Sequence, residues 1–362
     1  MRISFFNIQN LYFRDHSLDK NVPKPTNNWL SEMDQLMEKV QKGRQELHRI
    51  EELSLLLGFQ RRIKRRYGSL RNRGGQLILK EGLPNSEAKA DLTNGCKGWL
   101  RINNYPISYE SRMQKIRVLA ELNSDLILLQ EVEDRYALKT FVVESGKHFP
   151  GLNYNNIQVL EGKDSRGVEQ AILCKEKIKI NKIIPLEVNS ALGQAIHFHL
   201  NALPLEEIHL LSVYISHGNQ GISVEEEREK IFTRLADHYL SLCKEGKDNL
   251  LIIGTFRTPS YCYSLAPLLR QTDLKDISTH INFWVGPTKK STELHYPKSG
   301  IKEVVGKHDF ILTSPKLAKK IKAAGLIWSG RYWNDQANFR SYSSITSRHY
   351  QASDHPGLWL EI

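Results

Sequence analysis

The fold of this chain is decided by KHDFILTS, residues 307–314, and by SDHP, residues 353–356. Each stretch places ionisable residues just before a short apolar run, at residues 310–312 and 357–362. Short runs of this composition are typical of buried strands. The two stretches therefore predict two strands near the C-terminus, with Asp and His side chains where the strands begin.

Similar apolar runs recur along the rest of the chain and alternate with helical patterns. The runs lie at residues 3–8, 125–130, 170–174, 208–215 and 250–253. Apolar residues recur at helical spacing over residues 111–123, and residues 223–242 open with the capping box Ser-Val-Glu-Glu. Alternation of this kind over most of a chain predicts an α/β sandwich.

The composition is that of a globular protein with an excess of positive charge. The 362 residues are 40% hydrophobic, and 51 Lys and Arg against 40 Asp and Glu give a net charge of +11. A chain of this length can bury a sizeable core. The charge favours a polyanionic partner, such as nucleic acid or a phosphoinositide-bearing surface, and it equally fits an ordinary basic protein.

The cysteines and the apolar segments indicate the compartment. Cys96, Cys174, Cys243 and Cys262 are far apart and form no CxxC pair, so neither a cysteine zinc motif nor a disulfide framework is predicted. The N-terminal apolar run is too short for a signal peptide, and no apolar stretch approaches the roughly 20 residues that span a bilayer. We therefore expect a cytoplasmic protein without a membrane span.

Residues 15–104 interrupt the alternation of strands and helices. They carry few strand signals, one or two amphipathic helices within residues 30–57, and a basic run, RRIKRR, at residues 61–66. Such a run most often forms a solvated face, but it can also follow a phosphate backbone. We interpret residues 1–362 as a single domain with a basic helical insertion, residues 15–104, after the first strand.

Several short motifs, taken in order, resemble those of the endonuclease/exonuclease/phosphatase superfamily, whose best-known nuclease is deoxyribonuclease I. Besides the two C-terminal stretches, they are FFNIQNL at residues 5–11, LLQEVE at 128–133, SRGVEQAIL at 165–173 and VYISH at 213–217. Each motif is weak by itself, and their ordered occurrence is the stronger signal. The resemblance covers nearly the whole chain except the insertion. It implies a four-layered α/β sandwich, deoxyribonuclease I-like, in which two packed mixed sheets are flanked by helices.

The resemblance also implies a metal site for phosphodiester chemistry. It assigns Glu131 as a metal ligand, with help from Asn7, and Asp354 as a carboxylate on the metal side. Oxygen ligands of this kind suit Mg²⁺ or Mn²⁺. A bound cation of this type would neutralise the phosphate oxygens during hydrolysis.

Two carboxylate–histidine pairs follow from the same resemblance. It pairs His355 with Asp309, and His217 with Glu169. A carboxylate partner fixes the tautomer of an imidazole and raises its pKa, which suits a general acid or base. These four residues are the predicted catalytic groups.

One motif departs from the superfamily pattern. Where the superfamily keeps Gly-Asp-Phe-Asn, this chain has Gly-Thr-Phe-Arg at residues 254–257. Thr255 cannot act as a carboxylate base or as a strong metal ligand, whereas Arg257 can bind phosphate bidentately. Arg166 is a second candidate for a phosphate contact, and an ordinary surface arginine is the other interpretation.

His197 and His199 lie on one face of a predicted strand, because alternate residues share a face. They could form a metal pair. With no third ligand nearby in the sequence, we favour a half-exposed strand face.

Three functions are compatible with these observations. We expect a metal-dependent nuclease that hydrolyses phosphodiester bonds of DNA or RNA. The altered motif favours a second hypothesis, a catalytically inactive subunit that binds nucleic acid or forms a scaffold with a protein partner. A phosphatase of small phosphoesters ranks third, because no lipid-anchoring segment is visible.

Overall fold

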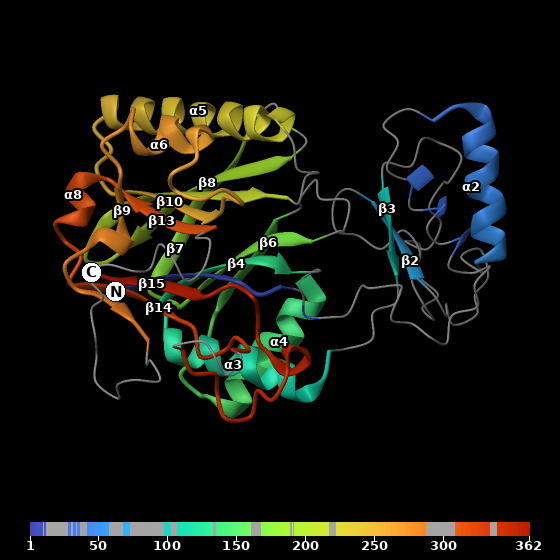
Figure 1. Ribbon diagram of the computed structural model, residues 1–362, viewed down its shortest axis with the longest axis horizontal. Helices are drawn as coiled ribbons and strands as arrows, with labels where there is room; N and C mark the ends of the chain where they lie inside the picture. The colour runs from blue at the N-terminus through green and yellow to red at the C-terminus, as the bar shows by residue number, and fades with distance from the viewer. Residues whose placement is uncertain are drawn as a thin grey trace.

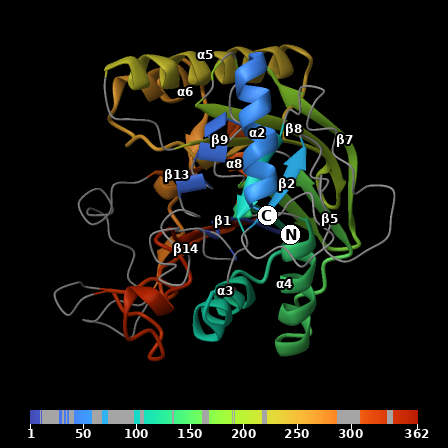
Figure 2. The same cartoon turned by 90° about the vertical axis from the view of Figure 1, so that its right-hand side faces the viewer.

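The computed structural model describes residues 1–9, 11, 28–29, 32–33, 35–36, 42–57, 68–72, 98–102, 107–132, 135–160, 168–188, 190, 192–216, 222–286, 308–333 and 339–362. Two β-sheets lie face to face at the centre, with helices on both outer sides (Figures 1 and 2). The four-layered sandwich predicted from the sequence is therefore confirmed.

The first sheet has seven strands in the order β12-β14-β15-β1-β4-β6-β5. Their bounds are β12 Phe283–Val285, β14 Ala323–Ile327, β15 Gly357–Glu361, β1 Arg2–Asn7, β4 Leu126–Val132, β6 Glu169–Cys174 and β5 Asn156–Leu160. β1 runs antiparallel to β15 and parallel to β4. The first and last strands of the chain are therefore neighbours inside one sheet.

The second sheet has six strands in the order β11-β13-β10-β9-β8-β7. Their bounds are β11 Lys275–Asp276, β13 Asp309–Thr313, β10 Leu250–Thr255, β9 Glu206–Ile215, β8 Gly193–Ala202 and β7 Ile178–Leu186. β10 runs parallel to β9 and antiparallel to β13. The parallel neighbours β9 and β10 therefore end at the same edge of the sheet.

Helices cover the outer face of each sheet (Figure 2). α3, Tyr109–Leu122, and α4, Arg135–His148, pack on the first sheet, while α5, Ile222–Lys244, and α6, Ala266–Leu269, pack on the second. The shorter helices are η3 Tyr263–Leu265, η4 Ile277–Thr279, α8 Pro315–Ala318 and η5 Arg348–Tyr350. None of the described helices is long and apolar enough to cross a membrane.

Apolar side chains fill three layers between these elements. The central core lies between the two sheets and joins Phe5 and Leu128 of the first sheet to Phe198 and Ile253 of the second. There are also two outer cores, and each of them lies between one sheet and the helices that cover it. Strands buried on both faces require near-continuous apolar sequences, which is why the short runs of Ile, Leu and Val predicted them.

The two predicted helices are present with small differences at their ends. Ser108 caps α3 by accepting a hydrogen bond from Ser111 N, and the C-cap residue that follows the helix, Asn123, is in the left-handed region at φ 41°. α5 begins at Ile222, so Ser223 lies inside the helix. The capping box predicted for that end is therefore wrong, because an N-cap residue must precede the first helical turn.

The segment of residues 15–104 contains α2, Arg44–Leu56, and a two-stranded sheet of β2, Gly68–Asn72, and β3, Gly98–Ile102. This strand pair was not part of the helical insertion that the sequence predicted. All three elements lie beside the sandwich rather than within it (Figure 1). The basic run at residues 61–66 lies outside the described residues.

Candidate active site

Predicted site residues from distant parts of the chain meet at one edge of the two sheets. In the parallel pair β1–β4, Asn7 lies opposite Gln130, directly before Glu131. In the second sheet, Thr255 at the end of β10 lies opposite Asp309 at the start of β13. The topology therefore places four of the predicted positions at the same end of the sandwich.

A hydrogen-bond chain connects four of these side chains. Asn7 Nδ2 donates to Thr255 Oγ1 at 3.2 Å, and Thr255 Oγ1 donates to Asp309 Oδ1 at 2.7 Å. Asp309 Oδ2 lies 2.7 Å from His355 Nδ1. An ionised carboxylate only accepts, so His355 carries a proton on Nδ1. Thr255 thus supports the His355–Asp309 pair, although it cannot replace the acid of the superfamily motif.

Pairing shifts the pKa of both His355 and Asp309. Burial favours a neutral imidazole, but the charge of Asp309 and its hydrogen bond outweigh burial and raise the pKa of His355. Burial would likewise raise the pKa of Asp309, yet the charge of His355 and the hydrogen bonds from His355 and Thr255 lower it. The geometry therefore favours an imidazolium beside a carboxylate.

Arg257 forms a buried ion pair with Glu131. Arg257 Nη2 donates to Glu131 Oε1 at 2.7 Å, and their side chains are 11% and 3% exposed. Tyr214 OH donates to the same oxygen at 3.2 Å. The residue that the sequence suggested as a metal ligand is thus bonded to the residue that replaces the Asn of the motif.

The backbone at this edge adopts conformations that few residues favour. Glu131 has φ 61° and lies at a register shift between Gln130 and Val132, as at a β-bulge. Arg257 has φ 54°. A bulge re-aims a side chain next to a site, and left-handed non-glycine residues concentrate at functional sites. The backbone conformations of Glu131 and Arg257, together with the ion pair itself, therefore fix the positions of the two side chains.

The donor atoms here fit Mg²⁺ or Mn²⁺ poorly. Such ions take several oxygen ligands, and Mg²⁺ demands near-ideal octahedral geometry. Thr255 supplies no charge, Glu131 accepts from Arg257, and Asn7 Oδ1 accepts from Gln9 N at 3.1 Å. The guanidinium of Arg257 would also repel a nearby cation. The arrangement fits an arginine at Glu131 better than a divalent ion.

Asp354 lies on the exposed side of the site, held by glutamines. Its carboxylate accepts from Gln9 Nε2 at 3.0 Å and from Gln351 Nε2 at 2.7 Å. Arg331 Nη1 donates to the Asp354 carbonyl at 3.2 Å. Through these three hydrogen bonds Asp354 helps to orient the loop that carries His355.

A buried lysine ties this loop to the first strand. Lys115 of α3 is 3% exposed, donates to Ile8 O at 2.6 Å and also donates to Ala352 O. Ser353 Oγ donates to Asn7 O at 2.8 Å. The two ends of the chain are therefore fixed together just behind Asn7 and His355.

The structure brings some of the predicted residues into the described site and not others. Glu169 is buried at the start of β6, opposite Val132. Its predicted partner, His217, lies outside the described residues, as does Arg166. The pairing of His217 with Glu169 and the phosphate contact of Arg166 therefore stay predictions.

Several residues of the site could not be singled out from the sequence. Gln130 Oε1 accepts from Thr255 N at 3.0 Å, and Tyr214 contacts Glu131. His308 precedes Asp309, and its pKa is lowered, chiefly by burial. Gln130 and Tyr214 lie inside the superfamily-like motifs, and no local pattern distinguishes such a residue from one that only packs. Their roles depend on partners in other strands.

No protein-family model and no curated protein matches the sequence. Solved structures do match. The chain is similar in structure to endonuclease/exonuclease/phosphatase proteins.

Three of these structures illustrate the similarity. A mannosyl-6-phosphatase of Bacteroides thetaiotaomicron is 14% identical, with 70% of this chain and 90% of that chain covered and a TM-score of 0.46. An endonuclease/exonuclease/phosphatase of Bacteroides vulgatus is 13% identical, with 70% and 90% covered and a TM-score of 0.47. The human Nocturnin catalytic domain is 15% identical, with 70% and 87% covered and a TM-score of 0.44.

Proposed function

We propose that this protein binds phosphate groups of DNA or RNA at the site around Arg257 and His355, and hydrolyses phosphodiester bonds slowly or not at all. The buried ion pair of Arg257 with Glu131 carries the proposal. It puts a permanent positive charge where the superfamily resemblance implies a divalent cation. A cation fixed in the chain can hold a phosphate, but it cannot generate a metal-bound nucleophile.

The chemistry of the two cations supports phosphate binding. A guanidinium carries five N–H donors in a fork that matches phosphate oxygens, and among the described residues the one hydrogen bond of Arg257 goes to Glu131. The raised pKa of His355 favours a second cation beside it. The net charge of +11 favours a polymeric anion over a single small phosphate.

Thr255 is the reason to expect weak hydrolysis. The superfamily motif has an acid at this position that holds or activates the attacking water. Thr255 donates its hydroxyl proton to Asp309, and a neutral hydroxyl is a poor base. Loss of one member of a catalytic set commonly costs several orders of magnitude in rate.

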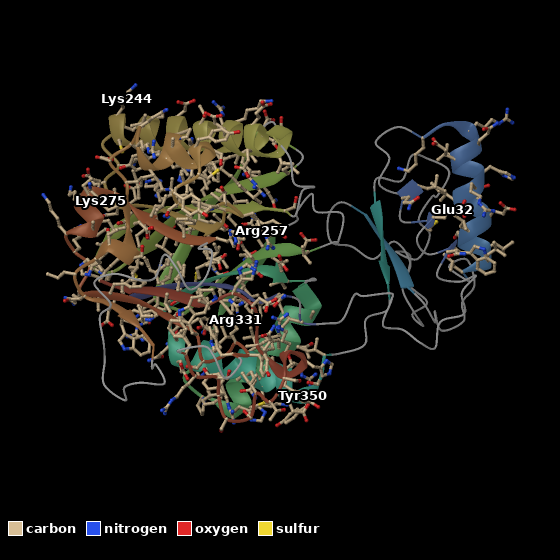
Figure 3. All side chains as sticks on the ribbon, viewed as in Figure 1. Glu32, Lys244, Arg257, Lys275, Arg331 and Tyr350 are labelled. Carbon is tan, nitrogen blue, oxygen red and sulfur yellow. The ribbon has the colours of Figure 1, made fainter. Side chains whose placement is uncertain are left out.

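Binding can be measured by fluorescence anisotropy with labelled single- and double-stranded DNA and RNA. Arg257→Lys keeps the charge but loses the fork, and we expect it to weaken binding about tenfold, the equivalent of one charged hydrogen bond. Lys244→Gln is the control, because Lys244 is exposed at the end of α5, far from Arg257 (Figure 3). Equal losses in both variants would contradict a phosphate site at Arg257.

A hydrolase remains the second candidate, and the His355–Asp309 pair favours it. An imidazolium held by a carboxylate is able to protonate a leaving oxygen. Cleavage of the same labelled nucleic acids would be followed with Mg²⁺, Mn²⁺ or EDTA, for wild type and His355→Ala. Cleavage by wild type that His355→Ala abolishes would establish the hydrolase and refute the binding-only function.

A further inference from the structure

Four histidines gather on the outer face of the second sheet, away from the candidate active site. His197 and His199 lie on β8, His209 lies on β9, and His238 lies on α5. His199 and His209 are directly opposite each other in the antiparallel register. Tyr214 follows His209 by five residues, so the strand rise separates this cluster from the active-site edge by about 17 Å.

Three potential ligand atoms converge within the cluster. Glu207 Oε1 lies 2.8 Å from His199 Nε2 and 3.1 Å from His209 Nε2, and the three atoms all lie within 4.8 Å of one another. The two imidazole rings are stacked with centroids 4.8 Å apart. Strand alternation places Glu207 and His209 on one face, and cross-strand pairing adds His199.

One of these atoms is a buried nitrogen without a hydrogen bond. His209 is 4% exposed, and its Nε2 has no hydrogen-bond partner among the described residues. Glu207 Oε1 lies 3.1 Å from it, as an ion-pair contact. A buried polar atom of this kind calls for a ligand or another explanation.

The other nitrogen of His209 takes part in a chain of contacts between histidines. His209 Nδ1 lies 2.9 Å from His197 Nε2, and His197 Nδ1 lies 3.3 Å from His238 Nε2. If each Nδ1 carries the proton, both contacts become hydrogen bonds. In that tautomer His209 Nε2 carries an unshared electron pair 3.1 Å from Glu207 Oε1, and a cation bound by both atoms would satisfy them.

We propose that His199, His209 and Glu207 bind a Zn²⁺ ion. Two imidazoles and one carboxylate form a known ligand set for zinc, with the fourth position open to water. Mg²⁺ and Ca²⁺ prefer an all-oxygen site and do not suit the two imidazoles. His197 orients the ring of His209 through the 2.9 Å contact of its Nε2 with His209 Nδ1, which is the usual task of an outer hydrogen-bond partner.

The surroundings are consistent with ion entry. Glu207 is 40% exposed and His199 is 30% exposed, so the ion can reach the ligands from solvent. The sequence did not predict this site, because the two ligands that join His199, Glu207 and His209, both lie on the next strand.

Lys247 competes with the proposed ion for Glu207. Its Nζ lies 2.9 Å from Glu207 Oε1, the atom that the ion would use, and the side chain is 31% exposed. Zinc binding therefore requires this ammonium to move away. We expect Lys247→Gln to tighten zinc binding, because it removes a positive charge that competes for the same oxygen.

The test uses tag-free full-length protein stripped of metal and titrated with Zn²⁺ against a chromophoric chelator. Wild type should bind zinc at this site with a rise in melting temperature. His199→Gln and Glu207→Gln should weaken binding at least about tenfold, whereas Lys247→Gln should strengthen it several-fold. His148→Gln, at an exposed histidine on α4, is the control and should bind like wild type.

The outcomes separate a site from a folding defect. Circular dichroism of each metal-free variant would show whether it folds, and a tighter Lys247→Gln cannot arise from misfolding. No zinc binding by wild type would overturn the proposal. Equal affinity of His199→Gln, Glu207→Gln and wild type would also overturn it, because the ion would then be held elsewhere.

Discussion

At the scale of single residues, the main departure from the superfamily motif is a paired change. Thr255 and Arg257 stand where an acid and an amide are expected. Thr255 extends the support of the His355–Asp309 pair, and Arg257 neutralises the buried charge of Glu131. The altered motif is therefore integrated into the hydrogen-bond network, so each replacement has a physical role.

Removing Arg257 tests how much its ion pair with Glu131 contributes to the stability of the protein. Arg257→Ala leaves the Glu131 charge buried without a partner, and we expect it to lower the free energy of unfolding by about 3 kcal/mol. Arg257→Ala combined with Glu131→Gln should be less destabilised than Arg257→Ala alone. Urea denaturation of wild type, Arg257→Ala, Glu131→Gln and the double variant measures this double-mutant cycle. Strictly additive effects would mean that the pair makes no coupled contribution.

His355 should make stability depend on pH. Its pKa is higher in the folded protein than in the unfolded chain, so its contribution is complete below the unfolded value of about 6.5. The contribution is lost as the pH rises through the higher folded value. The stability advantage of wild type over His355→Gln should therefore shrink as the pH is raised from neutral to alkaline. An advantage that grows with pH would show that the folded imidazole is neutral.

At the scale of elements, the sequence predicted best those strands that are apolar on both faces. β4, β6, β9, β10 and β13 are buried along most or all of their length. β7 is different: it is the edge strand, and much of it is exposed, so its mixed sequence carries no strong strand pattern. β5 and α4 were also not predicted.

The sequence predicted where the residues of the candidate site lie along their strands, but not which residues they contact. Asn7, Glu131, Asp309 and His355 all lie at strand ends or beside them, where the motifs placed them. Their hydrogen-bond partners come from other strands. The contact of Arg257 with Glu131 joins residues 126 positions apart, and no local pattern contains that information.

The end of β10 offers a test of whether the superfamily site can be restored. Thr255→Asp combined with Arg257→Asn returns the Gly-Asp-Phe-Asn sequence and releases Glu131 from its ion pair. We expect Mg²⁺ to stabilise this variant by about 2.7 kcal/mol at 100 times its dissociation constant, and to leave wild type unchanged. Melting curves with Mg²⁺ or EDTA measure the effect. An equal rise in wild type would show that Arg257 does not exclude the ion.

At the scale of the whole molecule, β1 and β15 are paired in the middle of one sheet, and this pairing fixes the site. Met1 N donates to Ile362 O at 2.8 Å, and Lys115 bridges Ile8 and Ala352 near the other end of the two strands. The elements of residues 15–104 lie beside this frame (Figure 1). If the charged residues of that segment contribute to binding, their contribution can be measured separately from that of the candidate site.

Salt dependence distinguishes the contribution of this segment from that of the site. Arg61, Arg62, Lys64, Arg65 and Arg66 would be replaced together by Gln. If the run follows a nucleic-acid backbone, the slope of log affinity against log salt should fall by about 0.9 for each phosphate of duplex DNA that the variant no longer neutralises. Arg257→Lys keeps its charge and should weaken binding with little change of slope. If the Gln variant keeps the wild-type slope, the basic run lies on a solvated face, and the phosphates must be bound by the sandwich itself.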